Sequence, residues 1–134
     1  MSRSGWAPGR PVLRVALALS VAGIAVLAFS PLPAPPGPEG IDKLQHAAAF
    51  ALLAALAEGA YPGRQIALAR WGLLFGYGLS IEAVQALLPY RDASAADLIA
   101  NAIGILSYVL GSALLRAGLA RRDAVAAAAQ SRGQ

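Results

Sequence analysis

The chain has 134 residues, of which 57% are hydrophobic and only 13% are charged. Soluble domains carry about 45–50% apolar and about 25% charged residues, so this composition is typical of a membrane protein. The sequence contains no cysteine, which excludes disulfides, thiolate zinc sites and cysteine nucleophiles. The net charge is +4, but the basic residues stand at the ends of apolar runs and form no stripe interleaved with aromatics. Nucleic acid is therefore not an expected partner.

Four apolar stretches follow one another along the chain, each bounded by charged residues, Pro or Gly. They cover about residues 12–30, 44–60, 66–88 and 98–115. A membrane-spanning helix needs about 20 residues to cross a hydrocarbon core of about 30 Å. The second stretch is short, but Lys43 and Glu58 near its ends can extend to the interface. The sequence thus predicts an all-α polytopic membrane protein, a single domain over residues 1–134 formed by a bundle of four transmembrane helices.

The first stretch follows basic residues and therefore also resembles a secretory signal peptide. It is longer than the usual hydrophobic region of such a peptide. Residues 30–36, Ser-Pro-Leu-Pro-Ala-Pro-Pro, follow it and contain no clean small-x-small cleavage site. We therefore expect a retained helix, while cleavage would leave the other three helices in the same orientation.

The distribution of Lys and Arg between the connections indicates the orientation of the helices, because cytoplasmic loops are enriched in these residues. One side carries nine of them: Arg3, Arg10, Arg14, Arg64, Arg70, Arg116, Arg121, Arg122 and Arg132. The connections on the opposite side carry only Lys43 and Arg91. The pattern predicts a multi-pass protein of the cytoplasmic (inner) membrane with both termini in the cytoplasm. Residues 116–134 then form a polar cytoplasmic tail.

The connections carry turn and capping signals. Residues 31–40 are rich in Pro and Gly and predict a short extended link. Residues 61–63, Tyr-Pro-Gly, predict a turn after the second helix, and Pro89 closes the third. Ser94 and Asp97 have the spacing of a capping box that opens the fourth helix.

Polar side chains gather at the predicted outer ends of the second, third and fourth helices. An ionisable group costs roughly 2.5–3.5 kcal/mol at the centre of a membrane helix, so each of these needs a reason. The candidate polar site consists of Asp42, Lys43, His46, Glu82, Gln85, Arg91, Asp97 and Asn101.

Spacings of three and four residues place these side chains on shared helix faces. Asp42 and His46 share a face with Phe50. Two further stripes are Gly78, Glu82 and Gln85 on the third helix, and Asp97, Asn101, Gly104, Tyr108 and Gly111 on the fourth. The small residues of the fourth helix, with Gly72 and Gly76 of the third, predict close approach of the helix backbones.

Several members of the candidate site also have a purely structural interpretation. Asp42 and Lys43 fit the role of interface anchors. Asp97 fits that of a helix cap near the positive end of the helix dipole. Asn101 is typical of a hydrogen bond between membrane helices.

His46 alone is more often a hydrogen-bonded packing residue than a ligand or base. Glu82 is harder to explain, because its carboxylate requires a partner such as Lys43, Arg91 or His46, or else a bound proton. A metal site built from His46, Glu82 and Asp97 is disfavoured, since one histidine is few for a transition metal. No metal or cofactor is expected.

The same positions resemble the pattern of the VanZ-like family of small bacterial membrane proteins. The three strings that carry the resemblance are Asp42-Lys43-x-x-His46-x-x-x-Phe50, Glu82-x-x-Gln85 and Arg91-x-x-Ser94-x-x-Asp97-x-x-x-Asn101-x-x-Gly104. It covers about residues 41–111. The family is named after a member associated with resistance to the glycopeptide teicoplanin. The resemblance implies membership more strongly than activity, and a role in antibiotic resistance is not inferred for this chain.

Three functions stay open at this stage. In the first, the site binds a cell-envelope ligand or membrane-protein partner, and Lys43 and Arg91 contact an anionic group. In the second, the protein is a hydrolase or transferase acting on a lipid-linked substrate, with His46 as general base or acid, oriented by Asp42 or Glu82. In the third, it is an accessory structural subunit of a larger membrane complex. Membrane lipids are expected partners in all three.

Overall fold

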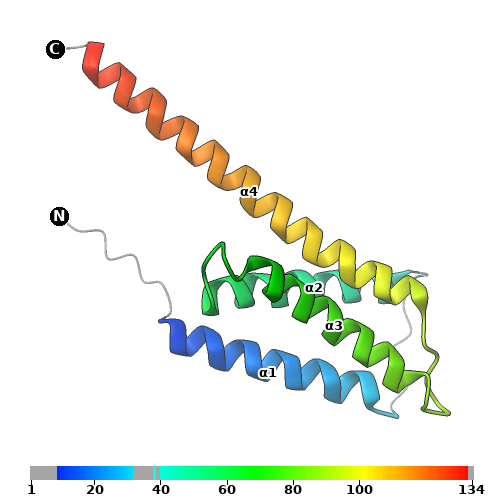
Figure 1. Cartoon of the computed structure of the whole chain (residues 1–134). Coiled ribbons are helices and arrows are strands. Elements are labelled where there is room, and N and C mark those ends of the chain that lie inside the picture. The colour runs from blue at the N-terminus through cyan, green and yellow to red at the C-terminus, as the bar shows by residue number, and fades with distance from the viewer. Residues whose placement is uncertain (1–8, 32–37, 39, 133–134) are drawn as a thin grey trace.

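The computed structural model describes residues 9–31, 38 and 40–132, and this part of the chain is all-α. Its four helices are α1 (Arg10–Phe29), α2 (Ile41–Ala60), α3 (Ala67–Gln85) and α4 (Ala95–Arg132). α2 and α3 pack against the first half of α4, α1 packs against α2 and α3, and the second half of α4 projects away from the other helices (Figure 1). The all-helical fold with four helices is confirmed. The predicted extended link lies largely outside the described residues, as does Arg3.

Proline and glycine set most of the helix boundaries. In α1 a proline occupies the first turn, where its missing N–H costs nothing, and Ser30 leaves the helix in an extended conformation before Pro31. Gly40 precedes α2 with a φ of 83°, in the left-handed region that favours glycine. The helix ends at Ala60, because Pro62 disfavours the helical conformation of Tyr61.

Four helix boundaries differ from the predicted ones by three residues or more. α2 begins at Ile41, so it has 20 residues and a length of about 30 Å, which removes the shortfall expected for the second stretch. α3 ends at Gln85, ahead of the expected end at residue 88. α4 starts at Ala95 and continues as one helix to Arg132, so the predicted tail is helical as far as the structure describes it. Its alanine-rich sequence explains this, since Ala has the highest helix propensity.

Two helices of the described chain are long and apolar enough to cross a membrane, namely α1 and α4 from Ala95 to Ser131. No residue of α1 is buried, although its sequence is almost entirely apolar. This finding supports association with a membrane. It does not extend to α2 and α3, and α3 carries three buried polar side chains, those of Arg70, Glu82 and Gln85.

The apolar core is centred on α2. Phe50, Leu53, Ala54 and Ala57 of α2 pack with Leu74 of α3 and Ile105 of α4. α2 and α4 approach most closely at Gly104, where an added Cβ would lie 2.2 Å from the carbonyl oxygen of Ala47. The close approach predicted at Gly72 and Gly76 is wrong, because a Cβ on either would meet nothing within 4 Å. On α3 the tight position is Gly78, which faces Asn101 and Phe50.

Candidate functional site

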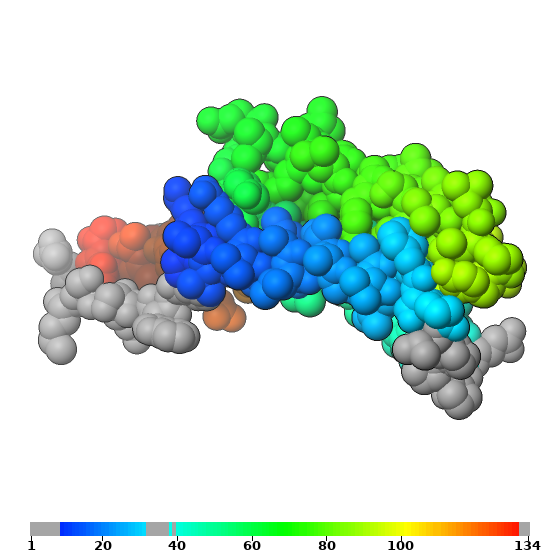
Figure 2. All heavy atoms as spheres, turned by 90° about the horizontal axis from the view of Figure 1, so that it is seen from below, coloured from blue at the N-terminus to red at the C-terminus, as the bar shows by residue number. Residues whose placement is uncertain are grey.

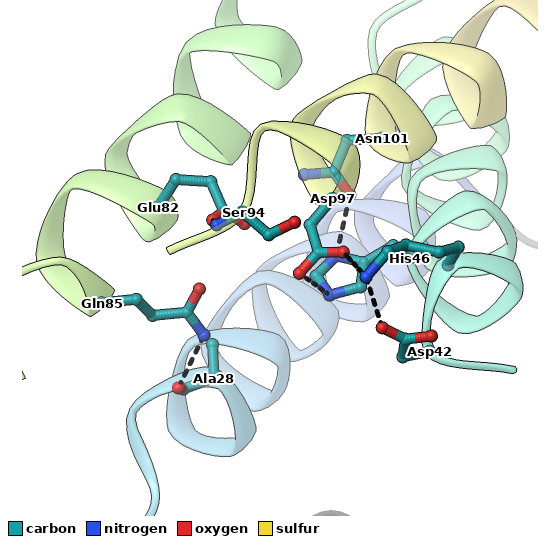
Figure 3. Close-up of polar contacts among 9 residues, drawn as sticks. Ala28, Asp42, His46, Glu82, Gln85, Ser94, Asp97 and Asn101 are labelled. Atoms are coloured by element: carbon teal, nitrogen blue, oxygen red, sulfur yellow. Dashed lines mark hydrogen bonds and ion pairs between the residues drawn. The ribbon is translucent and has the colours of Figure 1, made fainter. Parts of the chain in front are cut away.

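Polar side chains collect at the end of the bundle where α2 and α4 begin and α3 ends. We call this group the outer cluster. It contains Asp42, Lys43 and His46 of α2, Glu82 of α3, Ser94 just before α4, and Asp97 and Asn101 of α4 (Figure 3).

His46 joins α2 to α4 through both of its ring nitrogens. Its Nδ1 lies 3.0 Å from Oδ1 of Asn101, which is completely buried. Its Nε2 lies 3.7 Å from Oδ2 of Asp97. Because an amide oxygen only accepts hydrogen bonds, Nδ1 carries a proton and donates to Asn101. When Nε2 is also protonated, the imidazolium forms an ion pair with Asp97.

Lys43 connects the two aspartates of the outer cluster. Its Nζ forms ion pairs with the carboxylates of Asp42 and Asp97, with Nζ 2.6 Å from Oδ1 of Asp97. The side chain of Asp97 is only 14% exposed, whereas those of Asp42 and Lys43 are 53% and 39% exposed. Asp42 and Lys43 therefore form the accessible rim of the cluster, and Asp97 lies beneath them.

Glu82 binds the start of α4 rather than a cation. Its Oε2 accepts a hydrogen bond of 2.8 Å from the backbone N–H of Ser94. In a capping box this N–H would be bound by the side chain three residues later, which is Asp97. Glu82 takes that position here, which leaves the Asp97 carboxylate to Lys43 and His46. The partner of Glu82 is thus a backbone amide, and not Lys43, Arg91 or His46 as the sequence suggested.

Gln85 and Arg91 are directed away from His46, toward the end of α1. Gln85 Nε2 donates to the carbonyl of Ala28 at 3.0 Å, and Figure 3 shows this amide nitrogen turned toward Ala28. The Arg91 guanidinium donates to the carbonyls of Leu27 and Ser30, at 2.9 Å and 2.6 Å from its Nη2. The last carbonyls of a helix have no intrahelical partner, so these two side chains cap α1.

Two buried polar atoms of the outer cluster have no hydrogen-bond partner. They are Oε1 of Glu82 and Nδ2 of Asn101. Both side chains are more than nine-tenths buried. Oδ1 of Asp97 also has no hydrogen-bond partner, but the ion pair with Lys43 balances its negative charge. A buried acceptor and a buried donor without partners cost about 1–3 kcal/mol each, so they mark a place where further polar contact is favourable.

No protein-family model, no curated protein and no solved structure matches the chain. We therefore infer the function from the geometry of the outer cluster and from the sequence pattern.

The geometry limits the chemistry that the outer cluster can perform. The hydrogen bond to Asn101 occupies Nδ1 of His46, so only Nε2, which lies 3.7 Å from Asp97, is left to take a proton from a substrate. The sequence predicted that Asp42 or Glu82 would orient a catalytic His46. In the structure, Asn101 and Asp97 face its ring nitrogens instead. Among the described residues, no group of three His, Asp or Glu side chains could hold a metal ion.

A second polar group, the inner cluster, lies at the opposite end of the bundle. Glu58 of α2 has two partners on α4. It accepts a hydrogen bond of 2.7 Å from the hydroxyl of Tyr108, and it forms an ion pair of 3.1 Å with Arg116. Arg70 of α3 lies 3.9 Å from the same carboxylate and donates to the carbonyl of Tyr61 at 2.6 Å. Glu58 therefore joins three helices.

The inner cluster was not predicted as a unit, although its residues carried a signal. Tyr108 and Arg116 are eight residues apart, with Ser112 between them, and so share one helix face. Arg116 Nη2 indeed donates to the Ser112 hydroxyl at 3.0 Å. The positive-inside count assigned Arg70 to the edge of a loop, whereas its side chain is buried and lies over the ring of Trp71 at 4.3 Å. Tyr108, which the sequence placed on the stripe of the fourth helix, is the hydrogen-bond donor to Glu58.

Proposed function

We propose that the protein is a multi-pass protein of a bacterial cytoplasmic membrane in which all four helices cross the bilayer and both termini face the cytoplasm. α1, α2 and α3 have 20, 20 and 19 residues, which corresponds to about 30 Å each. Successive helices place the basic connections at the end of the inner cluster and the outer cluster at the other end. Large apolar side chains cover the outside of the bundle, for example Leu19, Leu68 and Leu73 at 68%, 85% and 75% exposure.

We further propose that the chain is a VanZ-like protein. The support is the three linked strings, and the helix positions agree with it. His46 and Asn101 come from two of the strings and contact each other directly. Glu82 of the remaining string binds Ser94, which belongs to the same string as Asn101. Members of all three strings thus lie in the outer cluster, whereas Gln85 and Arg91 of the same strings bind the end of α1.

The proposed function is the binding of a cell-envelope ligand at the outer surface by the outer cluster. The observation that supports it is the pair of buried, unpartnered atoms, one acceptor on Glu82 and one donor on Asn101, in a cluster that also carries the more exposed side chains of Asp42 and Lys43. A purely structural cluster would be expected to satisfy its own buried polar atoms.

The charges of the outer cluster favour a ligand with hydrogen-bond donors. Three carboxylates, those of Asp42, Glu82 and Asp97, accompany one ammonium group, that of Lys43. Arg91, expected to bind an anion with Lys43, has its donors engaged by α1. A hydroxyl- or amine-bearing head group, such as the sugar and peptide part of a lipid-linked cell-wall precursor, therefore fits better than a bare phosphate.

Thermal unfolding of the purified protein in detergent tests this proposal. We expect an undecaprenyl-linked disaccharide-pentapeptide to raise Tm and undecaprenyl phosphate to leave it unchanged. Asp42→Asn removes an exposed carboxylate from the cluster and should abolish the rise. Asp92→Asn, an equally conservative change of an exposed carboxylate before α4, is the matched control and should retain it. Equal shifts with both lipids, or no shift with either, would overturn the proposal.

An accessory role in a larger membrane complex is a second candidate, favoured by the projecting half of α4 (Figure 1). Its exposed apolar side chains include Leu114, Leu115, Leu119 and Val125, at 50–74% exposure. A partner helix could bury them. Co-purification of a stoichiometric partner that is lost on Leu119→Glu, with the outer cluster intact, would favour this role. Catalysis by a hydrolase or transferase is a weaker alternative, because Nδ1 of His46 is engaged by Asn101 and neither Asp42 nor Glu82 orients the ring.

A further inference from the structure

A groove of about 430 Å³ opens between α1 and α3, beside the last turn of α2. This volume lies within the range of about 300–1,000 Å³ that is typical of small-molecule sites. The lining is almost entirely apolar and includes Leu17 and Val21 of α1 and Ala69, Leu73 and Leu74 of α3. α1 lies across the face of the molecule shown in Figure 2, with α3 beside it.

One end of the groove carries positive charge. Arg70 lines the groove, its side chain is 7% exposed, and its Nε is buried without a hydrogen-bond partner. The guanidinium of Arg14 lies 4.9 Å from the ring centre of Tyr61, which also lines the groove. Glu58 is the carboxylate near Arg70, and it is closer to Arg116, at 3.1 Å against 3.9 Å. The positive charge at this end is therefore only partly balanced.

The other end of the groove is bounded by a contact between its two walls. The hydroxyl of Tyr77 on α3 donates to the carbonyl of Val21 on α1 at 2.6 Å, and both residues line the groove. From Ile66 to Tyr77 the groove follows α3 for roughly 16 Å, at 1.5 Å per residue. It thus combines an elongated apolar channel with a cationic end, which is complementary to an amphiphile with an anionic head.

We propose that this groove binds one acyl chain of an anionic glycerophospholipid, whose phosphate lies against Arg70 and Arg14. The proposal rests on the membrane placement given above, which puts the cationic end at the cytoplasmic surface. Anionic lipids are attracted to basic side chains at that surface. The guanidinium of Arg70 is incompletely paired, because its Nε has no hydrogen-bond partner, and the apolar walls match a hydrocarbon chain.

Native mass spectrometry of the full chain in a mild detergent tests the proposal with phosphatidylglycerol and phosphatidylcholine of identical acyl chains. We expect about tenfold tighter retention of phosphatidylglycerol, because the quaternary ammonium of phosphatidylcholine cancels the net negative charge that attracts basic side chains. Leu73→Trp fills the groove and should remove this retention. Leu68→Trp alters a similarly exposed leucine of α3 outside the groove and should preserve it. Arg14→Gln should lower the preference for phosphatidylglycerol, and Arg10→Gln should not.

Equal retention of the two lipids by the wild type would overturn the proposal, as would equal retention by the Leu73→Trp and Leu68→Trp proteins. A co-purified polypeptide displaced by Leu73→Trp, without bound lipid, would also overturn it and assign the groove to a partner helix. Carbonate extraction of membranes that contain the protein tests the membrane placement separately from the groove assignment. Release of the protein by carbonate contradicts the placement. A carbonate-resistant protein without lipid preference contradicts the groove assignment alone.

Discussion

His46 and Asn101, 55 residues apart in the sequence, lie with Nδ1 and Oδ1 only 3.0 Å from each other. This contact fixes one imidazole nitrogen as a hydrogen-bond donor and directs the other toward Asp97. Because Asn101 is completely buried and His46 is partly exposed, the pair links the interior of the bundle to its outer surface.

The pair should show a measurable coupling energy. In a double-mutant cycle of His46→Ala and Asn101→Ala, we expect a favourable coupling of about 0.6–1.7 kcal/mol, the range found for hydrogen bonds between membrane helices. Reversible unfolding in mixed micelles measures it. A cycle of His46→Ala with Ser107→Ala, an exposed position of α4, is the control and should give no coupling. Zero coupling between His46 and Asn101 would contradict the observed geometry.

Periodicity and charge predicted the four helices and the meeting of Asp42, His46, Asp97 and Asn101 at one end of the bundle. These features depend on local spacing and on the length of apolar runs, which a sequence displays directly. Nothing in such a pattern shows which helix a side chain faces. Gln85 was therefore grouped with its neighbours on the stripe, whereas it binds α1.

The tight glycine positions show the same limit. Gly72, Gly76, Gly78 and Gly104 are equally small in the sequence, but only the last two face another helix closely. Their difference arises from the rotation of each helix about its axis, which depends on packing over the whole bundle. The inner cluster was missed for a related reason, because Glu58 meets its partners only once three helices are assembled.

Gly104→Ala should destabilise the protein by about 1–3 kcal/mol, because the added methyl group would overlap the backbone of Ala47 and force α2 and α4 apart. Gly111→Ala provides the matched control on the same helix, since its Cβ would meet nothing within 4 Å. The control should be neutral or stabilising by up to about 1 kcal/mol, from helix propensity. Thermal unfolding in detergent compares the two, and equal Tm values would be inconsistent with close packing at Gly104.

Glu58→Gln should cost more stability than Arg116→Gln, although both break the same ion pair. The first change leaves Arg70, which is 7% exposed, without its carboxylate, and losing one partner of a buried pair costs about 3–5 kcal/mol. Arg70 is 3.9 Å from Glu58, so the lower end is expected. The second change removes a cation that is 60% exposed, for which about 0–1 kcal/mol is typical. Unfolding in mixed micelles gives both values, and the reverse order would show that Arg70 does not depend on Glu58.

Because the chain has no cysteine, single cysteines can report the side of the membrane on which each connection lies. We expect a membrane-impermeant maleimide to label Asp92→Cys in intact spheroplasts, since this exposed residue lies between α3 and α4 at the outer end. Gln65→Cys, exposed between α2 and α3, and Gln130→Cys, exposed on the projecting half of α4, should react only after permeabilisation. Labelling of Gln65→Cys together with Asp92→Cys would show that α3 does not cross the bilayer. Labelling of Gln130→Cys with Asp92→Cys would show the same for α4.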